Sequence, residues 1–567
     1  MRLSHAYVPT RKEVPADAVM PSHQWMLRAG MIRPLVSGVY SYLPIGWKVM
    51  RKVMRIIREE MDSIGGQELQ LPVLNPVEIW DESGRNTDFG DEMFRLQDRK
   101  GRTLILAPTH EEVICDLARK YIQSYKDLPQ IWYQIQTKFR DEPRPRSGVM
   151  RTRQFIMKDS YTLDVDDDGL NAGYQAHAGA YRKIFTRCGL TFHVVGASSG
   201  LMGGGRSQEF MVESPYGEDA LVLCDHCGKA DNLEVASSVP PAAPESSGEL
   251  VKIKTPGQKT IQEVSGFLKK SPREMMKSLV YASDEPVMIL IRGDHEINES
   301  KLIKLFGPSV RPAHPDEIIE ICGTEAGYVG PIGLKRSITI VADRALENQQ
   351  NLTTGANEKD RHLSGIDLMR DCPEIRYVDV RNVISGDGCS ECGSPVRVFN
   401  AVELGHIFKL GTKYSEAMKA MYSDPDGNEK PIFMGSYGIG VERIVAACIE
   451  QNFRPERGML WNRGLAPYLV HLIPVNMDKE EITRLADALY TDLVSGNIDT
   501  LLDDRKGSAG FKFKDADLLG MPIHVILGGK WIKEKQIEIK NRHTGEVVLV
   551  NRDQFMDTIE KIIDSLS

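Results

Sequence analysis

The sequence predicts an α+β protein built from several domains. Residues 1–222 mix amphipathic helical periods with short strands. At residues 236–249 the composition changes to a run rich in alanine, serine and proline, which is typical of a solvated linker. The C-terminal part alternates apolar strands, such as 468–474 and 522–527, with helical stretches, as βαβ units do. A length of 567 residues accommodates three or four domains.

The composition is that of an ordinary soluble protein, with 41% hydrophobic and 26% charged residues. Apolar runs such as residues 287–291 are too short to cross a bilayer, and residues 1–10 lack the apolar core of a signal peptide. We therefore expect a cytoplasmic protein without a membrane partner. Nine cysteines, an odd number, argue against a disulfide framework. The net charge of −8 means that any nucleic acid must be bound by local basic patches.

The first motif is an amphipathic helix followed by a short strand. Apolar residues recur at helical spacing through residues 47–61, and Gly65 and Gly66 end the helix. A strand is predicted over residues 68–74. Because Pro72 cannot donate a hydrogen bond to a sheet, this strand should lie at an edge or an interface. A helix that only packs on a sheet explains this feature equally well.

The second motif is a charged antiparallel hairpin. Residues 139–142 (Phe-Arg-Asp-Glu) are separated by a loop rich in proline and arginine from residues 151–155 (Arg-Thr-Arg-Gln-Phe). Arginine suits a phosphate because its guanidinium forms paired, charge-assisted hydrogen bonds. A carboxylate such as Glu142 could accept from an exocyclic amine, and Phe155 could stack on a purine. The alternative is a solvated hairpin without a ligand.

The third motif is a glycine-rich strand that leads into a helix. Glycines at 435, 438 and 440 would let the backbone approach a ligand closely. A dinucleotide fingerprint would need a third glycine where Arg443 stands, and no P-loop sequence occurs. An arginine at the start of the following helix suits a terminal phosphate.

These three motifs, in this order, resemble the signature motifs of class II aminoacyl-tRNA synthetases. Within that class the chain is most similar to the bacterial-type prolyl-tRNA synthetases, with further matching stretches at 38–44, 107–112 and 405–415. The resemblance implies an antiparallel sheet flanked by helices, an inserted α/β domain and a C-terminal α/β domain. It also implies a homodimer formed through the first motif.

The resemblance implies an enzyme that activates proline with ATP and Mg²⁺ and transfers it to tRNA(Pro). Arg140 and Arg443 would be its catalytic residues. The expected ATP-binding residues are Arg140, Glu142, Arg151, Phe155 and Arg443. The expected proline-binding residues are Thr109, Glu111, Arg140, Asp159, Tyr161 and Ser436. The secondary ammonium group of proline has two N–H donors, and Thr109 and Glu111 can accept their hydrogen bonds.

Residues 250–385 match the editing insertion of this family, which hydrolyses alanine mischarged onto tRNA(Pro). Its expected editing residues are Lys277, Asp294, His295 and His362. The C-terminal part resembles an anticodon-binding domain, with matching stretches at 503–506 and 510–515. The expected domains are catalytic, first part (1–228), editing insertion with its linker (229–388), catalytic, second part (389–465), and anticodon-binding (466–567).

Two CxxCG knuckles enclose the insertion. Four thiolates can bind structural zinc in tetrahedral geometry, so our hypothesis is one structural Zn²⁺ held by Cys224, Cys227, Cys389 and Cys392. Four reduced thiols without a metal are the alternative.

Two other functions remain open at this stage. One is a synthetase paralogue without catalytic activity that serves as a regulatory or tRNA-binding subunit. The other is a class II synthetase for another amino acid, such as threonine. The presence of Arg140, Glu142 and Arg443 argues against the first.

Overall fold

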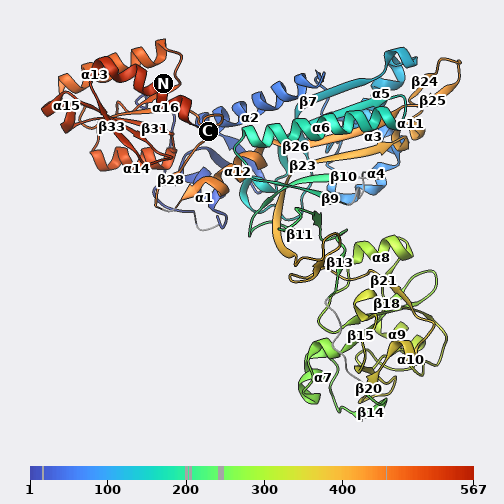
Figure 1. Ribbon diagram of the computed structural model, residues 1–567. Helices are drawn as coiled ribbons and strands as arrows, with labels where there is room; N and C mark the ends of the chain where they lie inside the picture. The colour runs from blue at the N-terminus through green and yellow to red at the C-terminus, as the bar shows by residue number, and fades with distance from the viewer. Residues whose placement is uncertain (16–17, 198–201, 203–206, 241–247, 455, 567) are drawn as a thin grey trace. The chain divides into compact units, whose positions relative to one another are not determined.

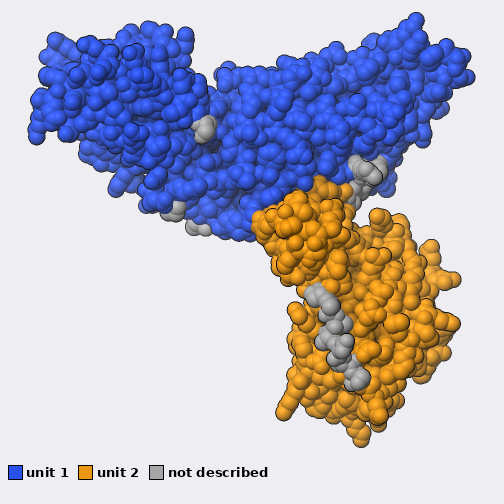
Figure 2. Space-filling view, viewed as in Figure 1, with its two compact units in different colours: residues 1–194, 199–217, 401–567 blue, residues 195–198, 218–400 orange. Residues whose placement is uncertain are grey.

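The computed structural model describes residues 1–15, 18–197, 202, 207–240, 248–454 and 456–566. Residues 241–247 of the predicted linker lie outside this range. The chain divides into two compact units, one of residues 1–194, 199–217 and 401–567 and the other of residues 195–198 and 218–400 (Figure 2). The inserted domain was predicted to span residues 229–388, and the second unit extends beyond both of these limits. No helix among the described residues is long and apolar enough to cross a membrane.

The first unit is built on a largely antiparallel sheet, as predicted. Five neighbouring strands of this sheet follow the order β23 (Arg397–Gly411), β26 (Phe433–Gly440), β8 (Gln154–Asp164), β7 (Gln130–Phe139) and β3 (Gln67–Glu68). Among these five strands the short edge pair β3–β7 is parallel, and the other three pairs are antiparallel.

Helices pack on both faces of this sheet (Figure 1). Tyr437 and Ile439 of β26 share an apolar core with α2 (Pro44–Ser63), α6 (Asp167–Arg187) and α12 (Val441–Asn452). Met434 has the opposite parity along the strand, so it points to the other face, where it meets α5 (Glu111–Tyr121) and α3 (Val77–Ser83).

The helix predicted for the first motif is confirmed, but the strand predicted after it is wrong in its limits. Helix α2 covers the predicted range and buries the expected apolar stripe. The predicted strand 68–74 is interrupted, because only β3 and β4 (Leu74–Pro76) form ladders. Pro72 lies between them, and its carbonyl accepts hydrogen bonds from the side chains of Asn75 and His110. The proline therefore ends the pairing, and β3 lies at the edge of the sheet.

Two sheets of more than two strands lie wholly within the second unit. The larger follows the order β17 (Arg311–Pro312), β15 (Met276–Ala282), β16 (Val287–Arg292), β18 (Thr339–Asp343) and β21 (Arg376–Val378). The smaller consists of β14 (Val251–Lys254), β20 (Arg361–Ile366) and β19 (Leu352–Gly355). Helices α7 (Ile261–Leu268), α8 (Glu299–Phe306), α9 (Pro315–Cys322) and the short α10 (Leu368–Asp371) belong to this unit, an α/β arrangement as predicted.

The C-terminal part forms its own mixed sheet. Parallel strands β30 (Thr500–Leu502), β29 (Val470–Pro474) and β31 (Ile523–Leu527) are followed by antiparallel β32 (Ile537–Asn541) and β33 (Val547–Val550). Helices α13 (Glu480–Ser495) and α16 (Phe555–Ser565) pack against its apolar core. Both strands predicted here from apolar runs are confirmed.

Candidate active site

The hairpin of β7 and β8 carries the first part of the candidate site. The strands pair as far as Phe139 and Gln154, so the loop begins at Arg140. The Arg140 N–H donates to the Arg153 carbonyl at 3.0 Å, which fixes the backbone. The Arg140 guanidinium lies beside the Phe155 ring, with Cζ 5.4 Å from the ring centroid. The hairpin thus presents one cation and one aromatic ring together.

Glu142 and Arg151 form an ion pair across the same hairpin. Arg151 Nε lies 2.6 Å from Glu142 Oε2. Burial opposes ionisation of Glu142, but the Arg151 hydrogen bond and the Arg144 N–H hold its pKa below the ordinary value. A nucleotide that uses both side chains must share or displace this ion pair.

Arg443 lies at the start of α12, immediately after the glycine-rich strand. Its Nε donates to the Met150 carbonyl at 3.0 Å, and its Nη1 lies 3.2 Å from a carboxylate oxygen of Glu403. Burial and the charge of Arg443 lower the pKa of Arg140. Arg140 Nε is buried and has no hydrogen-bond partner among the described residues. Two guanidinium groups that repel each other form a suitable site for an anion.

The glycine at 435 is explained by packing rather than by a ligand. A Cβ atom there would lie 2.1 Å from the Tyr437 hydroxyl oxygen and 2.7 Å from Thr162 Oγ1. At Gly438 a Cβ would meet only Met157 Sδ, at 3.6 Å. The expected close approach of backbone to ligand is therefore not required at Gly435.

Three predicted proline-binding residues meet at one buried carboxylate. Thr109 Oγ1 donates to Glu111 Oε2 at 2.6 Å, and Ser436 Oγ donates to Glu111 Oε1 at 2.8 Å. Although Glu111 is fully buried, the charge of Arg85 and these hydroxyl groups keep its pKa low. The site therefore holds an ionised carboxylate with little access to water.

Asp159 and Tyr161 form a second acidic group beside this pocket. The Tyr161 hydroxyl donates to Asp159 Oδ2 at 2.8 Å and accepts the His110 N–H at 3.1 Å. Asp159 Oδ1 is buried without a hydrogen-bond partner among the described residues. An unpaired buried carboxylate oxygen is costly, so this atom is a suitable acceptor for a ligand N–H.

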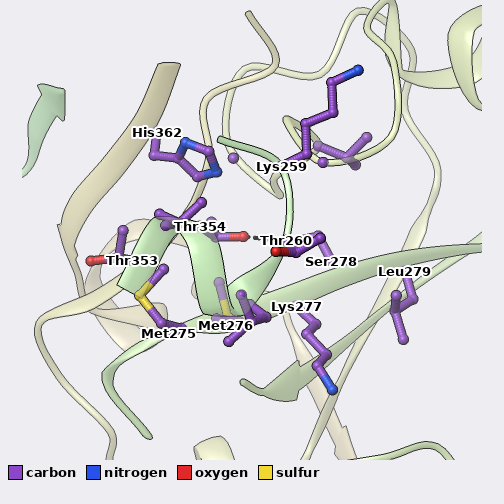
Figure 3. Close-up of a pocket in the computed structure, with 15 residues that line it drawn as sticks. Lys259, Thr260, Met275, Met276, Lys277, Ser278, Leu279, Thr353, Thr354 and His362 are labelled. Carbon is purple, nitrogen blue, oxygen red and sulfur yellow. Dashed lines mark hydrogen bonds between the residues drawn. The ribbon is translucent and has the colours of Figure 1, made fainter. Parts of the chain in front are cut away.

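The second unit holds a cavity of about 150 Å³ between its two sheets. Lys277 on β15 and His362 on β20 both line it. Figure 3 shows the Lys277 side chain running away from His362 and Thr354. Its Nζ donates to the His295 carbonyl at 2.6 Å and to the Glu296 carboxylate at 2.7 Å. The ammonium group is thus held outside the cavity.

Asp294 and His295 do not line this cavity. Arg292 Nε donates to Asp294 Oδ1 at 2.6 Å, and Arg292 Nη2 lies 2.8 Å from His295 Nε2. Burial, Arg381 and Arg292 lower the pKa of His295 to about 3. Of the four predicted editing residues, Lys277 and His362 therefore line the cavity, whereas Asp294 and His295 lie outside it, where the His295 carbonyl accepts from Lys277.

The four knuckle cysteines converge within the second unit. Their sulfur atoms all lie within 4.8 Å of one another. Cys224 Sγ is 3.5 Å from Cys392 Sγ, and Cys227 Sγ is 3.7 Å from Cys389 Sγ. Residues more than 160 positions apart in sequence thus meet at one point.

Two protein-family models and many known relatives match this chain. The family model for the tRNA synthetase class II core domain (G, H, P, S and T) matches residues 94–452, and the anticodon binding domain matches residues 469–562. The proline--tRNA ligase of Thermodesulfovibrio yellowstonii is 45% identical over 97% of both chains. That of Halothermothrix orenii is 46% identical over 100% of both.

The chain belongs to the proline--tRNA ligase family. A crystal structure of prolyl-tRNA synthetase from Cryptosporidium parvum, complexed with L-proline and AMP, has a similar fold. It aligns with a TM-score of 0.57 at 12% identity and covers 96% of this chain and 75% of that chain.

Arg85 is a buried cation that was not predicted from the sequence of this proline--tRNA ligase family member. Arg85 is fully buried, and its Nη1 lies 3.0 Å from both Glu111 and Glu112. The rings of Phe89 and Tyr414 surround the guanidinium. A single arginine at the first position of the short helix α4 (Arg85–Asp88) gives no periodic signal, so its role is seen only in the three-dimensional structure.

Lys138 is the second buried cation that was missed. It lies 2.9 Å from Asp159 and also contacts His110. Gln134, on the same side of β7, donates to the same Asp159 oxygen at 2.9 Å. A signal was present here, because Gln134, Gln136 and Lys138 alternate along the strand and predict a polar face.

Proposed function

We propose that this protein activates proline with ATP to prolyl-adenylate and then transfers the prolyl group to tRNA(Pro). The observation that carries the proposal is the buried, ionised Glu111 held by Thr109 and Ser436. It lies close to Arg140, whose buried Nε has no hydrogen-bond partner among the described residues. A negative pocket beside a positive group suits the ammonium and carboxylate of one amino acid. Proline-dependent charging of tRNA by the purified protein tests this proposal.

The chain's own residues would act mainly by positioning and by electrostatic stabilisation. Arg140 would hold the prolyl carboxylate as it attacks the α-phosphorus, and pyrophosphate leaves. Arg443 would stabilise the outer phosphates, while Phe155 stacks on adenine. Mg²⁺ would enter with ATP and neutralise phosphate charge. The ribose hydroxyl of the tRNA would then attack the adenylate carbonyl, forming the prolyl ester and releasing AMP as the acyl–phosphate bond breaks.

Recognition of tRNA would use exposed groups of the C-terminal part. Lys506, Phe511 and Lys514 are exposed there. Lys512 and Asp503 are buried, and Lys512 donates to the Asp503 carbonyl at 2.9 Å. We therefore assign these two residues to the internal structure and the exposed ones to RNA contact.

We further propose a cytoplasmic homodimer formed through the first motif. Within this motif Trp47 of α2 is 40% exposed. Leu35 and Val36 of β1 (Ile32–Val36), which precede the motif, are 74% and 59% exposed. Exposed apolar side chains close to one another in sequence suit a subunit interface.

We also propose that the insertion hydrolyses alanyl-tRNA(Pro). Alanine is smaller than proline and cannot be excluded from a proline pocket by size, so a second, smaller site is physically sensible. The cavity lined by Lys277 and His362 supports this site. The Lys277 ammonium points away from the cavity. It would therefore either contact the end of the tRNA or act only after its ion pair with Glu296 is broken.

Replacing Lys277 by alanine should abolish deacylation of alanyl-tRNA(Pro) and leave proline activation unchanged, because the ammonium group belongs to the second compact unit. Release of labelled alanine from the ester measures the first activity, and pyrophosphate exchange measures the second. Lys252→Ala is the matched control, since Lys252 is an exposed lysine of the same unit whose salt bridge is to Glu358. Deacylation at the wild-type rate would remove Lys277 from the editing site.

We propose that Cys224, Cys227, Cys389 and Cys392 hold one structural Zn²⁺. At a Zn–S distance of about 2.3 Å, tetrahedral ligation separates the sulfur atoms by about 3.8 Å. The separations of 3.5 and 3.7 Å fit this requirement. The cysteines lie near both ends of the insertion, so the ion would fix its base and take no part in activation.

Protein purified without chelator should contain about one zinc per chain. A Cys224→Ser/Cys389→Ser double variant should lose the metal and melt at a lower temperature, while its proline-dependent exchange persists. Elemental analysis and thermal melting measure these outcomes. Cys322→Ser is the matched control, because Cys322 is a buried cysteine of the same unit outside the cluster. Equal zinc contents in the double variant and the wild type would exclude this site.

A further inference from the structure

The N-terminal segment of the chain is bound to the C-terminal part of the first unit (Figure 1). The Leu3 N–H donates to the Leu502 carbonyl, and the Leu502 N–H donates to the Met1 carbonyl, both at 2.9 Å. These bonds lie on the free side of β30, the outermost strand of the C-terminal sheet. Leu3 is buried in an apolar core that also contains Leu501. The segment therefore covers an exposed sheet edge and is anchored there.

The next residue of the segment holds an acidic side chain of the loop that follows β30. The Ser4 N–H donates to Asp504 Oδ1 at 2.8 Å, and the Ser4 hydroxyl donates to Asp504 Oδ2 at 2.7 Å. Arg2 Nη1 lies 3.7 Å from the same carboxylate, and the Asp504 side chain is only 10% exposed. Both oxygens of Asp504 thus accept from the segment, and a nearby cation offsets the charge.

A second contact of the segment reaches the helix that follows this loop. Thr10 Oγ1 donates to Asp515 Oδ1 at 3.1 Å, in α14 (Ala509–Leu519). The other carboxylate oxygen of Asp515 lies 2.9 Å from Arg505 Nη1. Arg505 also donates to both oxygens of Asp503, at 2.9 Å each. Arg505 is thus held between two carboxylates, one of which is positioned by the segment.

The far end of the segment is bound beside β1. Arg33 Nη2 donates to the Pro9 carbonyl at 2.6 Å, and the Arg11 N–H donates to the Arg28 carbonyl at 2.8 Å. Residues 1–11 therefore form a strap, which we call the N-terminal strap, with one end on β30 and the other next to β1.

The loop that the strap holds lies among the groups assigned to RNA contact. Lys506 belongs to this loop, and 85% of its side chain is exposed. Phe511 is 38% exposed, and its ring centroid lies 4.8 Å from Arg505 Cζ. Lysine can hold a phosphate and an aromatic ring can stack on an unpaired base. An uncompensated Asp504 carboxylate beside them would repel phosphate, so the strap both fixes the loop and offsets this charge.

We propose that the N-terminal strap holds the loop 503–506 in the conformation that binds tRNA, with Ser4 and Thr10 as positioning residues. This inference rests on the proposed charging of tRNA(Pro) and deepens it. Asp504 acts through the strap and does not read a base. Activation of proline precedes the tRNA step, so it is independent of these contacts.

The test is the KM for tRNA(Pro) in charging, measured beside proline-dependent pyrophosphate exchange. Ser4→Ala removes one hydrogen bond to a carboxylate, so the KM for tRNA should rise about five- to tenfold while exchange stays at the wild-type rate. Thr10→Ala should act in the same direction. Ser4→Thr keeps the hydroxyl and should have the wild-type KM. Thr558→Ala is the matched control, because this exposed hydroxyl of α16 donates to the Gln554 carbonyl.

A double variant separates positioning from direct recognition of RNA. When Asp504 acts only through the strap, Ser4→Ala/Asp504→Asn should have the same KM for tRNA as Asp504→Asn alone. A KM that rises by the product of the two single effects would show that Asp504 contacts RNA itself, which contradicts the inference.

Two further results would overturn the inference. One is an unchanged KM for tRNA in both Ser4→Ala and Thr10→Ala, whatever their melting temperatures, because the strap would then serve stability alone. The other is a loss of pyrophosphate exchange equal to the loss of charging. Absence of charging by the wild type would instead contradict the proposed function, so the two failures are distinct.

Discussion

Replacing Arg443 by alanine should lower kcat for proline-dependent pyrophosphate exchange by about 10²- to 10³-fold, or about 3–4 kcal/mol of transition-state stabilisation. The guanidinium would contact charge that develops as pyrophosphate leaves. Its loss also leaves Glu403, 3.2 Å away, as a carboxylate that repels phosphate.

Arg443→Lys separates charge from geometry in the same assay. Lysine keeps the positive charge but lacks the planar, forked guanidinium with which Arg443 donates to Met150 and Glu403 through two different nitrogens. We expect an activity between those of the alanine variant and the wild type. An alanine variant with wild-type exchange and an unchanged melting temperature would show that Arg443 does not contact the phosphates.

Replacing Arg85 by methionine should raise the KM for proline at least a hundredfold and lower the stability of the first unit by about 3–5 kcal/mol. Despite its burial, the carboxylates of Glu112 and Glu111 raise the pKa of Arg85. Without the cation, two buried carboxyl groups share one site, so one must take up a proton and Glu111 no longer offers a reliable charge to the ammonium of proline.

The double variant Arg85→Met/Glu112→Gln is the internal control for this effect. It removes one of the two carboxylates, so we expect part of the lost stability to return. Thermal melting and the two KM values measure both variants. A KM for ATP that rises as much as the KM for proline would show general damage instead of a specific effect on the proline pocket.

The sequence was sufficient for the parts of the fold that repeat a simple period. The stripe of α2 and the apolar strands at 470–474 and 523–527 follow directly from burial of one face. The continuous strand predicted over residues 68–74 is not formed. Pro72, which has no N–H, separates the ladder of β3 from that of β4. Local sequence patterns therefore predicted the presence of helices and strands better than the residues at which they begin and end.

The candidate site could be predicted only where its residues lie in recognisable motifs. Arg140 and Arg443 lie in the second and third motifs and Glu111 in the matching stretch 107–112, and the structure brings these three close enough for their charges to interact. Arg85 and Lys138 act through partners that are distant in sequence, so no local pattern shows which carboxylates they neutralise. The direction of the Lys277 side chain depends in the same way on Glu296, which follows one strand later.

The central claim is that the buried pocket around Glu111 selects proline for activation by ATP. ATP–pyrophosphate exchange across a panel of amino acids tests it most directly. We predict exchange that is fastest with proline, weak with alanine and absent with threonine. Exchange driven by threonine in preference to proline would assign the chain to another substrate. The absence of exchange with every amino acid of the panel would contradict the catalytic account.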